Sequence, residues 1–443
     1  MKKRKEVLFF LIYVVLISSV LSCSDKNDVI KLNFWHCMDG KGGECIDTLV
    51  NEFNEGIGRQ KKIRINPVYI DWPGTTALTP AMISNNLNNL PDVLQLYGEL
   101  VSVVSTYENV LWAEELISSD ISNISKSDIL TSALSAFTIN EKLLSVPLNI
   151  STLLMYYNLT YLKEAGYDNP PATFDELIDM LPALKEKTNA EYGLHVRIGN
   201  YELENFVTNQ GDAGYYYANN KSGRDGPVTK LICEKPLHNF LCKWDSVINT
   251  GTVNFSTRST TEEFATGIDA IAFMTGARIS IVGDLIGDSF EWGVAPIPLV
   301  DKNDVGASAT NGASVVMFKR DDIEREKAMW TFIEYLVSPQ AQIILMRDMG
   351  YIPLNIYSAE NSYLQELILA KPQLKILTEV LKSAPSSAIT TFFPNFGSID
   401  SIIVDEIMKQ GEKMQNSDTT CFNIIDKCNK VLEEYYRINQ IKN

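Results

Sequence analysis

The segment that decides how this chain divides runs from Asn149 to Asn158 and reads NISTLLMYYN. It follows a short apolar strand predicted over residues 143–147, and it leads into a helix that ends at Gly166. Thr173 then begins a new helix with Glu176 three residues later, which is the spacing of a capping box. Nothing in the segment has the pattern of a catalytic site. It therefore indicates a chain that crosses between two lobes and starts the second one.

The N-terminus has the pattern of a secretion signal. Basic residues fill positions 2–5, an apolar run extends from Val7 to Ile17, and small residues lead to Cys23. The run is shorter than the roughly 20 apolar residues that a membrane span needs, although an uncleaved anchor helix stays open as the alternative. Val20-Leu21-Ser22-Cys23 resembles the bacterial lipobox, and this resemblance implies removal of residues 1–22 and lipidation of Cys23.

The mature chain would then be held at a membrane by its lipid, with residues 23–28 as a polar tether, and would face the periplasm or the exterior. Loss of residues 1–22 takes away four basic residues and one acidic residue, so the formal charge of −16 becomes −19. A chain this acidic is a poor partner for nucleic acid.

Beyond Cys23, six cysteines fall in three pairs of sequence neighbours: Cys37 with Cys45, Cys233 with Cys242, and Cys421 with Cys428. In an exported protein an even number of cysteines favours disulfides. We expect the neighbours to pair, although the sequence leaves other connectivities open. The chain has no CxxC motif, and only His36 lies beside a cysteine, so the sequence predicts neither a metal site nor a cofactor.

The length of the mature chain, about 420 residues, indicates two domains. The first third alternates predicted strands and helices over residues 29–35, 45–54, 63–69, 75–87 and 91–96. This alternation predicts an α/β fold with a parallel sheet, whose ligands bind outside the carboxyl ends of the strands. Three loops fall at those ends: Trp35-His36, Asp71-Trp72-Pro73 and Tyr97-Gly98-Glu99.

The remainder repeats the α/β pattern. The predicted elements are strands over 192–198, 270–274, 293–298 and 310–318, helices within 230–250, 259–265, 323–337 and 402–438, an extended segment over 349–354 and a loop over 199–202.

Nine segments then occur in the order of a known family: KLNFWHCMDG, LPDVLQLY, VPLNISTLLMYYN, AGYDNPPATFDEL, FATGIDAIAFMTG, WGVAPIPL, TNGASVVMF, AMWTFIEYLVSPQAQ and MGYIPL. Each is similar to a landmark of the family 1 extracytoplasmic solute-binding proteins of ABC importers, which include the maltodextrin, sugar and glycerol-3-phosphate receptors. The resemblance covers roughly residues 30 to 410.

The resemblance implies a periplasmic-binding-protein-like type II fold, in which two α/β lobes surround a ligand cleft and hinge segments cross between them. It places one lobe at residues 24–146 plus 309–347 and the other at 147–308 plus 348–443. It also implies a monomer that binds a small solute, delivers it to ABC permease subunits in the membrane, and is not an enzyme.

A sugar or polyol site needs aromatic faces and planar polar groups that pair with hydroxyls. The sequence and the resemblance together suggest these ligand-binding candidates: Trp35, Trp72, Tyr97, Glu99, Ser151, Arg197, Tyr201, Thr275, Arg278, Asn311, Gly312 and Tyr351. Ordinary packing stays open for each aromatic residue, and a salt bridge stays open for each arginine. Arg278 follows a predicted helix start, where an anion would be favoured.

One departure from the family pattern counts against a phosphate ligand. The glycerol-3-phosphate receptors carry an arginine just before an IVDE-like segment, and residues 398–406 of this chain contain none. Their acidic residue after the third strand falls on Gly98, with Glu99 shifted by one. Arg197 or Arg278 would have to substitute for the missing arginine.

Enzyme motifs are absent from the sequence. The chain has three histidines and no GxSxG, Walker A or HExxH motif, and no pair of carboxylates stands out. We therefore expect a receptor for a carbohydrate or small polyol. The alternatives are a glycerol-3-phosphate or glycerophosphodiester receptor and, from another class, a surface or signalling lipoprotein that reuses the fold.

Overall fold

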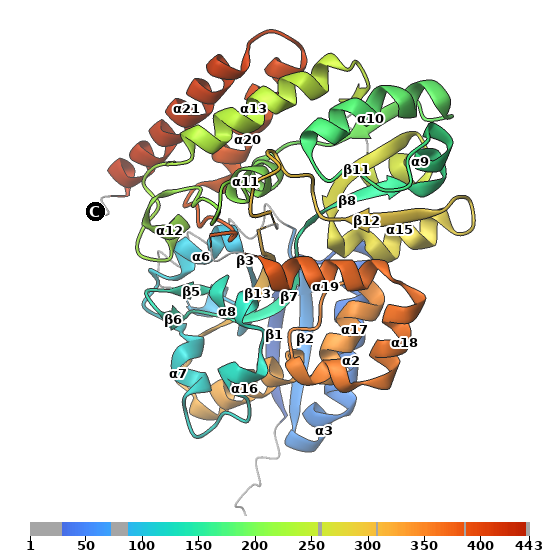
Figure 1. Ribbon diagram of the computed structural model, residues 1–443. Coiled ribbons are helices and arrows are strands. Elements are labelled where there is room, and N and C mark those ends of the chain that lie inside the picture. The colour runs from blue at the N-terminus through green and yellow to red at the C-terminus, as the bar shows by residue number, and fades with distance from the viewer. Residues whose placement is uncertain (1–28, 72–86, 256–258, 307–308, 385–386, 440–443) are drawn as a thin grey trace, which may run out of the picture.

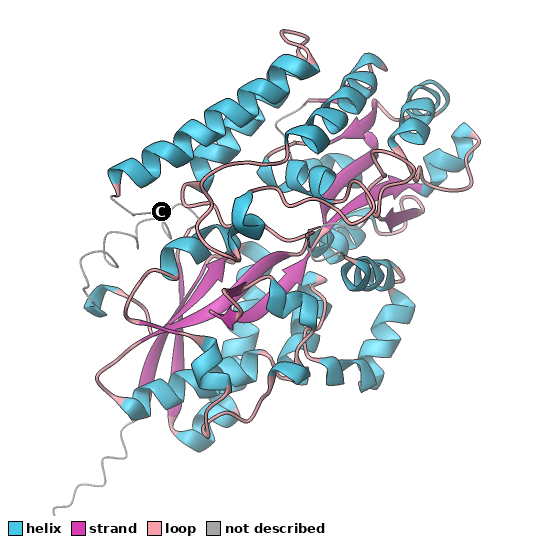
Figure 2. Ribbon diagram, turned by 60° about the vertical axis from the view of Figure 1, so that its left-hand side comes forward, coloured by secondary structure: helices cyan, strands magenta, loops and turns pink. Residues whose placement is uncertain are grey.

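The computed structural model describes residues 29–71, 87–255, 259–306, 309–384 and 387–439 (Figure 1). The predicted signal segment, Cys23, the tether, Trp72 and the helix predicted from residue 75 lie outside the described residues. Two sheets, each flanked by helices, form two lobes that lie one above the other in Figures 1 and 2. The predicted α/β fold with two lobes is confirmed.

The first lobe is built on a sheet of mixed direction with the strand order β2-β1-β3-β13-β4, and β7 also pairs with β13. β1 runs parallel to β2 and β3, as predicted, whereas β13 runs antiparallel to β3, β4 and β7. The strands are β1 (Ile30–His36), β2 (Ile63–Tyr69), β3 (Val93–Tyr97), β4 (Val110–Leu111), β7 (Val146–Ser151) and β13 (Asn311–Phe318).

Helices cover this sheet because their apolar residues recur at helical spacing. α2, for example, buries Ile46, Leu49 and Phe53 against the strands. The principal helices of this lobe are α2 (Gly40–Glu55), α3 (Ile57–Lys61), α6 (Val101–Val104), α7 (Ala113–Ile117), α8 (Thr131–Ser135), α16 (Ile323–Leu336) and α17 (Pro339–Met349), with the hairpin β5 (Thr138–Ile139) and β6 (Lys142–Leu143) beside them.

The second lobe has the strand order β10-β9-β11-β8-β12. Its strands are β8 (Leu153–Asn158), β9 (Tyr192–His195), β10 (Val253–Asn254), β11 (Asp269–Thr275) and β12 (Trp292–Ala295). Its helices are α9 (Leu159–Ala165), α10 (Phe174–Lys187), α11 (Asn200–Thr208), α12 (Asn219–Gly223), α13 (Glu234–Asn249), α14 (Thr260–Ala265), α15 (Ile279–Ile286), α20 (Phe396–Gly411) and α21 (Ser417–Ile438).

The segment NISTLLMYYN passes from one sheet to the other. β7 of the first sheet ends at Ser151 and β8 of the second begins at Leu153, so Thr152 is the single residue between them. Thr152 is fully buried, and its hydroxyl donates to the carbonyl oxygen of Ala309 at 2.9 Å. Its own carbonyl accepts from Gly276 N at 2.8 Å. The crossing is therefore held on both sides by backbone groups.

Three local expectations differ from the structure. Thr173 caps α10 as predicted, but the Glu176 carboxylate accepts from Ala172 N at 2.7 Å instead of from Thr173 N. The loop predicted over 199–202 is wrong, because α11 begins at Asn200. The strand predicted over 192–198 ends at His195.

The segment after residue 347 includes η5 (Ile356–Glu360), α18 (Ser362–Ala370) and α19 (Gln373–Ser383). η5 packs against α17 of the first lobe, and Leu364 shares a core with first-lobe residues. The lobe boundary at residue 347 stays a prediction.

The six described cysteines are free thiols, so the predicted disulfides between neighbours are wrong. Cys421 and Cys428 lie seven residues apart on α21, which separates their Cα atoms by roughly 10 Å, beyond the ~7 Å that a disulfide tolerates. Cys233 and Cys242 are separated in the same way along α13. Burial raises the pKa of Cys421 and of Cys428 to about 12, which keeps both thiols protonated and unreactive.

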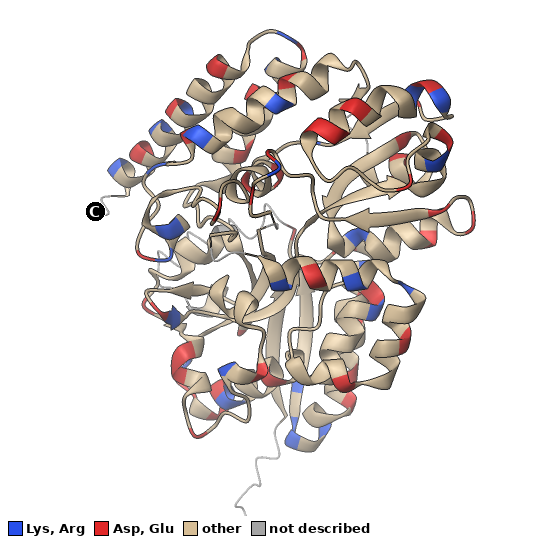
Figure 3. Cartoon of the chain, viewed as in Figure 1, with Lys and Arg blue, Asp and Glu red and all other residues tan. Residues whose placement is uncertain are grey.

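Charged residues lie mainly on the helices outside the two sheets, whereas the strands are mostly uncharged (Figure 3). Within the described part of the chain, no helix combines the length and apolar character that crossing a membrane requires.

Candidate functional site

Polar and aromatic residues from both lobes meet where the chain crosses. We call this group the crossing cluster, and its members are Asn149, Ser151, Tyr201, Thr275 and Tyr351. Asn149 and Ser151 lie on β7, Tyr201 on α11 and Thr275 at the end of β11, while Tyr351 follows α17. Four of them, all but Asn149, were among the predicted ligand-binding residues.

Ser151 joins the two lobes directly. It is 4% exposed, and its Oγ accepts hydrogen bonds from Thr275 Oγ1 and from Ala277 N, both at 3.0 Å. Thr275 also caps the short helix η4 (Gly276–Arg278). A buried backbone N–H needs an acceptor, so Ser151 stabilises the start of η4 as well as the crossing.

Asn149 occupies a buried position in β7 at 1% exposure. Its Oδ1 accepts from Gln95 Nε2 at 3.1 Å, and Gln95 Oε1 accepts in turn from Cys37 N at 3.0 Å. These contacts fix the amide so that Nδ2 is its remaining donor. Nδ2 is buried and makes no hydrogen bond of standard geometry among the described residues, although the Tyr351 side chain lies close enough to interact with it.

Tyr201 is the corresponding group in the second lobe. Its hydroxyl is buried and likewise makes no hydrogen bond of standard geometry in the part of the chain that the structure describes, although the Thr275 side chain lies close enough to interact with it. Burial raises its pKa, so it stays protonated and can both donate and accept. Tyr351 lies near both Tyr201 and Asn149.

Other buried polar atoms of the described residues also lack a partner, among them Tyr217 Oη and Asn158 Nδ2, so the lack of a partner does not by itself mark a site. Asn149 Nδ2 and Tyr201 Oη are distinguished by their place on opposite sides of one crossing, where a single ligand or water would contact both lobes.

Two acidic residues, Glu202 and Asp400, lie near Tyr201. Burial raises the pKa of the Glu202 carboxyl to about 7, although Gly199 N donates to Glu202 Oε2 at 2.9 Å and favours its charged form. Asp400 Oδ1 accepts from Asn200 N at 2.8 Å, and its other oxygen lies 3.6 Å from Arg197 Nη2. Arg197 is 64% exposed, so the salt bridge left open for it is present in a weak form.

Arg278 is exposed at the boundary between η4 and α15. It lies close enough to Tyr156 and Tyr351 to favour their ionised forms, although burial outweighs it and raises the pKa of both. Tyr156 donates to the carbonyl oxygen of Thr275 at 2.8 Å. Arg278 is therefore a cationic side chain close to the crossing cluster.

Close packing of the backbone leaves no room for a side chain at Gly312. Its φ is +153°, and a Cβ at this position would lie 2.0 Å from the carbonyl oxygen of Asn149. Asn311 pairs with Ser151 in the register of β13 and β7. Both residues therefore place the crossing strands against one another, and a contact of either with ligand stays a prediction.

The remaining candidates lie on the first lobe. Trp35 packs against the first-lobe core, which is the ordinary packing left open for it. The Tyr97 hydroxyl lies 3.5 Å from Met38 Sδ. Glu99 lies within η2 (Gly98–Leu100), which follows β3, and Trp72 lies outside the described residues.

Gln95, Asn149 and Glu202 were not among the ligand-binding candidates suggested by the sequence, although Asn149 lies in the crossing segment with Ser151. Gln95 and Asn149 are single amides inside the apolar strands VLQLY and VPLNIS, and both are buried. A single amide side chain within an apolar strand could have indicated a buried polar site, because a buried amide requires a hydrogen-bond partner.

Comparison with known proteins identifies the family of the chain. The family model described as bacterial extracellular solute-binding protein matches residues 48–373. The chain belongs to this family. These solute-binding proteins serve as receptors of ABC importers, as the sequence resemblance implied.

Among curated solute-binding proteins, the sn-glycerol-3-phosphate-binding periplasmic protein UgpB of Brucella abortus (strain 2308) is 23% identical over 412 residues, covering 91% of this chain and 93% of the relative. UgpB of Yersinia pestis is 24% identical and covers 81% of each chain.

Among solved structures, the sugar-binding protein MalE from Xanthomonas citri has a TM-score of 0.76 at 19% identity and covers 93% of this chain and all of its own. UgpB from Mycobacterium tuberculosis in complex with glycerophosphocholine has a TM-score of 0.74 at 19% identity, covering 91% and 98%. At these identities the structural likeness shows the fold alone.

Proposed function

We propose that this solute-binding protein is a lipid-anchored receptor that binds a carbohydrate or small polyol at the crossing cluster and delivers it to a membrane permease. The observation that carries the proposal is the pair of buried groups without a hydrogen bond of standard geometry among the described residues, Asn149 Nδ2 and Tyr201 Oη, supplied by opposite lobes. A hydroxyl-rich solute offers an acceptor to the amide and either role to the phenol. Tyr351 supplies a neighbouring aromatic face.

Such a ligand would act by holding the lobes together. A solute that contacts both lobes binds the closed arrangement more tightly than the open one, and this difference in affinity shifts the population toward closure. The crossing at Thr152 provides the mechanical link, since it is one residue long and pinned by Ala309 and Gly276. The lipid anchor rests on the lipobox-like segment ending at Cys23.

A second candidate is a glycerol-3-phosphate or glycerophosphodiester receptor. Two observations favour it: the curated relatives are named for sn-glycerol-3-phosphate, and Arg278 lies beside the cluster. Arg197 also approaches Asp400, within the segment where the glycerol-3-phosphate receptors carry their arginine. A phosphate ester would need one of these guanidinium groups as its partner.

A thermal-shift screen tests both candidates. The purified protein is melted with maltose, glucose, glycerol, sn-glycerol-3-phosphate and glycerophosphocholine at increasing concentrations. A true ligand stabilises the fold by RT ln(1 + [L]/Kd), about 2.7 kcal/mol at 100 times Kd. Absence of a shift with every compound would refute the small-solute proposal.

Two variants separate the ligand classes. If a phosphate ester binds, Arg278→Ala should abolish its shift, whereas Arg437→Ala on the distant end of α21 serves as the matched control. If a sugar binds, Trp72→Ala should remove its shift, and unchanged affinity would take Trp72 out of the site.

A further inference from the structure

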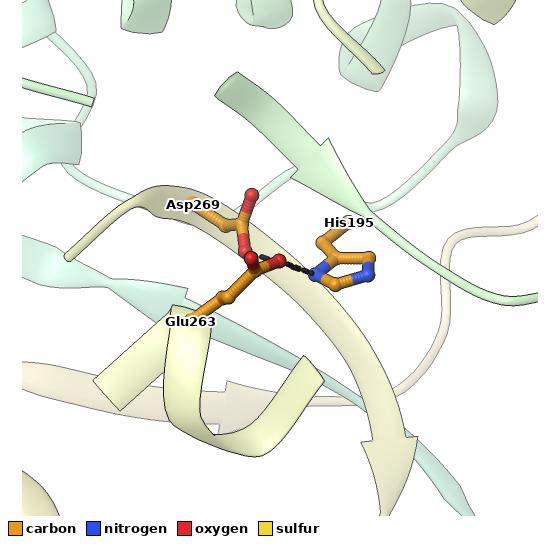
Figure 4. A group of neighbouring side chains, drawn as sticks. All are labelled: His195, Glu263 and Asp269. Carbon is orange, nitrogen blue, oxygen red and sulfur yellow. Dashed lines mark hydrogen bonds and ion pairs between the residues drawn. The ribbon is translucent and has the colours of Figure 1, made fainter. Parts of the chain in front are cut away.

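Three potential metal ligands meet inside the second lobe, away from the crossing cluster (Figure 4). His195 ends β9, Asp269 begins β11, and Glu263 lies on α14, which packs against β11. Their exposed fractions are 1%, 0% and 7%. Figure 4 shows both carboxylates directed at the same ring nitrogen of His195.

The spacing of these atoms matches a coordination site. His195 Nδ1 lies 3.0 Å from Asp269 Oδ2 and 3.2 Å from Glu263 Oε2, and the three ligand atoms all lie within 4.8 Å of one another. Around a tetrahedral Zn²⁺ ion, bonds of about 2.0–2.2 Å place neighbouring ligand atoms roughly 3.2–3.5 Å apart. The separations of the three ligand atoms therefore need little adjustment to hold such an ion.

The chemistry of the three groups also fits a divalent transition metal. An imidazole with two carboxylates is a mixed nitrogen and oxygen donor set, which suits Zn²⁺ and its first-row neighbours better than Ca²⁺ or Mg²⁺. A divalent ion between these two buried carboxylates would add to the compensation of their negative charge.

Neighbouring side chains already orient the ligand groups. Asn254 Nδ2 donates to Glu263 Oε2 at 3.0 Å and to Asp269 Oδ1 at 2.9 Å. Thr260 Oγ1 lies 3.5 Å from His195 Nε2, on the side of the ring away from the carboxylates. Such outer contacts hold ligands in place and fix the imidazole tautomer in metal sites.

We propose that His195, Glu263 and Asp269 bind a divalent transition-metal ion, with Zn²⁺ the best fit, and that this ion is a structural part of the second lobe. Water would complete the coordination. The ion would tie together β9, α14 and β11. β9 continues into the chain that carries Arg197 and Tyr201, so the ion would also anchor the base of the crossing cluster.

The test uses the full mature chain, stripped of metal with a chelator, and no solute, so its outcome is independent of the proposed receptor function. Zn²⁺ is titrated in competition with a chromophoric chelator, and melting is followed with and without the metal. We expect one equivalent of Zn²⁺ to bind and to raise the melting temperature. A wild-type protein that takes up no Zn²⁺ and melts unchanged would overturn the proposal and leave a buried histidine–carboxylate ion pair.

Variants locate the ion. His195→Gln and Asp269→Asn should weaken binding by about 100-fold or more, since loss of an outer-shell partner alone costs 10–100-fold. His238→Gln is the matched control, because His238 pairs with Asp418 on the surface at 2.7 Å and is 41% exposed. Loss of Zn²⁺ in the control, with retention in His195→Gln, would contradict the proposal.

If the buried variants do not fold, Co²⁺ replaces Zn²⁺ in chains that retain His195. The protein has three histidines, so paramagnetically shifted imidazole signals that persist in His36→Gln and in His238→Gln belong to His195. Disappearance of these signals in either variant would place the metal elsewhere.

Discussion

Replacing Arg224 by methionine should destabilise the protein, because this buried side chain joins three separate segments. Arg224 is 8% exposed, and its guanidinium donates to the carbonyl oxygens of Ser222, Thr390 and Ala136, the last at 3.0 Å. It also lies 3.5 Å above the Phe392 ring. Ala136 follows α8 in the first lobe, whereas Ser222 belongs to α12 in the second.

The size of the effect follows from opposing contributions. Burial lowers the pKa of Arg224 to about 9, which corresponds to a cost of roughly 5 kcal/mol for keeping its charge inside. Three hydrogen bonds from a charged donor return about 1.5–3 kcal/mol each, and the ring contact adds about 1–2 kcal/mol. Methionine keeps the apolar stem but leaves three carbonyls without this donor. These contributions leave a net loss of about 0.5–6 kcal/mol in the free energy of unfolding, with a midpoint of about 3 kcal/mol.

Urea unfolding followed by tryptophan fluorescence and far-UV circular dichroism measures this loss. Lys142→Met is the control, since it removes an exposed cation from the neighbouring β6 and should leave the transition unchanged. An Arg224→Met variant within about 0.5 kcal/mol of the wild type would refute the reasoning, because it would mean that the desolvation cost cancels the three hydrogen bonds.

Three further perturbations test other parts of the structure. The folded-state pKa of Glu202, about 7, lies above its unfolded value, so the stability that Glu202 contributes is present below pH 4.5 and is lost as the pH rises through 7. Between pH 5 and 8 the wild type should therefore lose on the order of 2 kcal/mol more of its free energy of unfolding than Glu202→Gln does. Parallel pH profiles for the two proteins would contradict this. Asp92 is 3% exposed, and both of its carboxylate oxygens accept hydrogen bonds from Arg325 at 2.8 Å. Asp92→Asn should therefore lower the free energy of unfolding in urea by about 3–5 kcal/mol. A loss under 1 kcal/mol would show that this ion pair does not stabilise the fold. Gly312→Ala should cost more than about 3 kcal/mol in the same assay or prevent folding, because its Cβ would lie 2.0 Å from a carbonyl oxygen. The control is Gly397→Ala on α20, whose Cβ would meet nothing within 4 Å and which should be neutral or gain about 0.5 kcal/mol. Equal effects of the two substitutions would contradict the packing argument.

The sequence was sufficient to predict the crossing and the α/β class, because both depend on local patterns. The apolar run through NISTLLMYYN and the alternation of strand and helix are visible without knowledge of distant contacts. The family resemblance placed Ser151 at the crossing, whereas Thr275, Tyr201 and Tyr351 were expected only as residues of the ligand cleft. The direction of β13 was not predicted, since a strand that returns from residue 311 carries no mark of its partners.

The predictions that failed have two causes: the spacing of residues along a helix, and contacts between segments that are far apart in the sequence. The cysteine pairs were expected to join because they are neighbours in sequence, but a helix holds Cys421 and Cys428 too far apart. Gln95 and Asn149 meet across 54 residues, and Tyr201 reaches the cluster only because α11 starts at Asn200. The group of His195, Glu263 and Asp269 has no motif spacing, and only the fold brings it together.

The central claim is that a small solute binds between the lobes through Tyr201 and Asn149. Isothermal titration calorimetry with the compound that gives the largest thermal shift tests it most directly, using wild type, Tyr201→Phe and the exposed-site control Tyr363→Phe, whose side chain on α18 is 45% exposed. Loss of a buried hydrogen bond costs about 1–3 kcal/mol, so Tyr201→Phe should weaken binding by roughly 10-fold or more while Tyr363→Phe binds as wild type does. Equal affinity in all three proteins would show that the solute binds elsewhere.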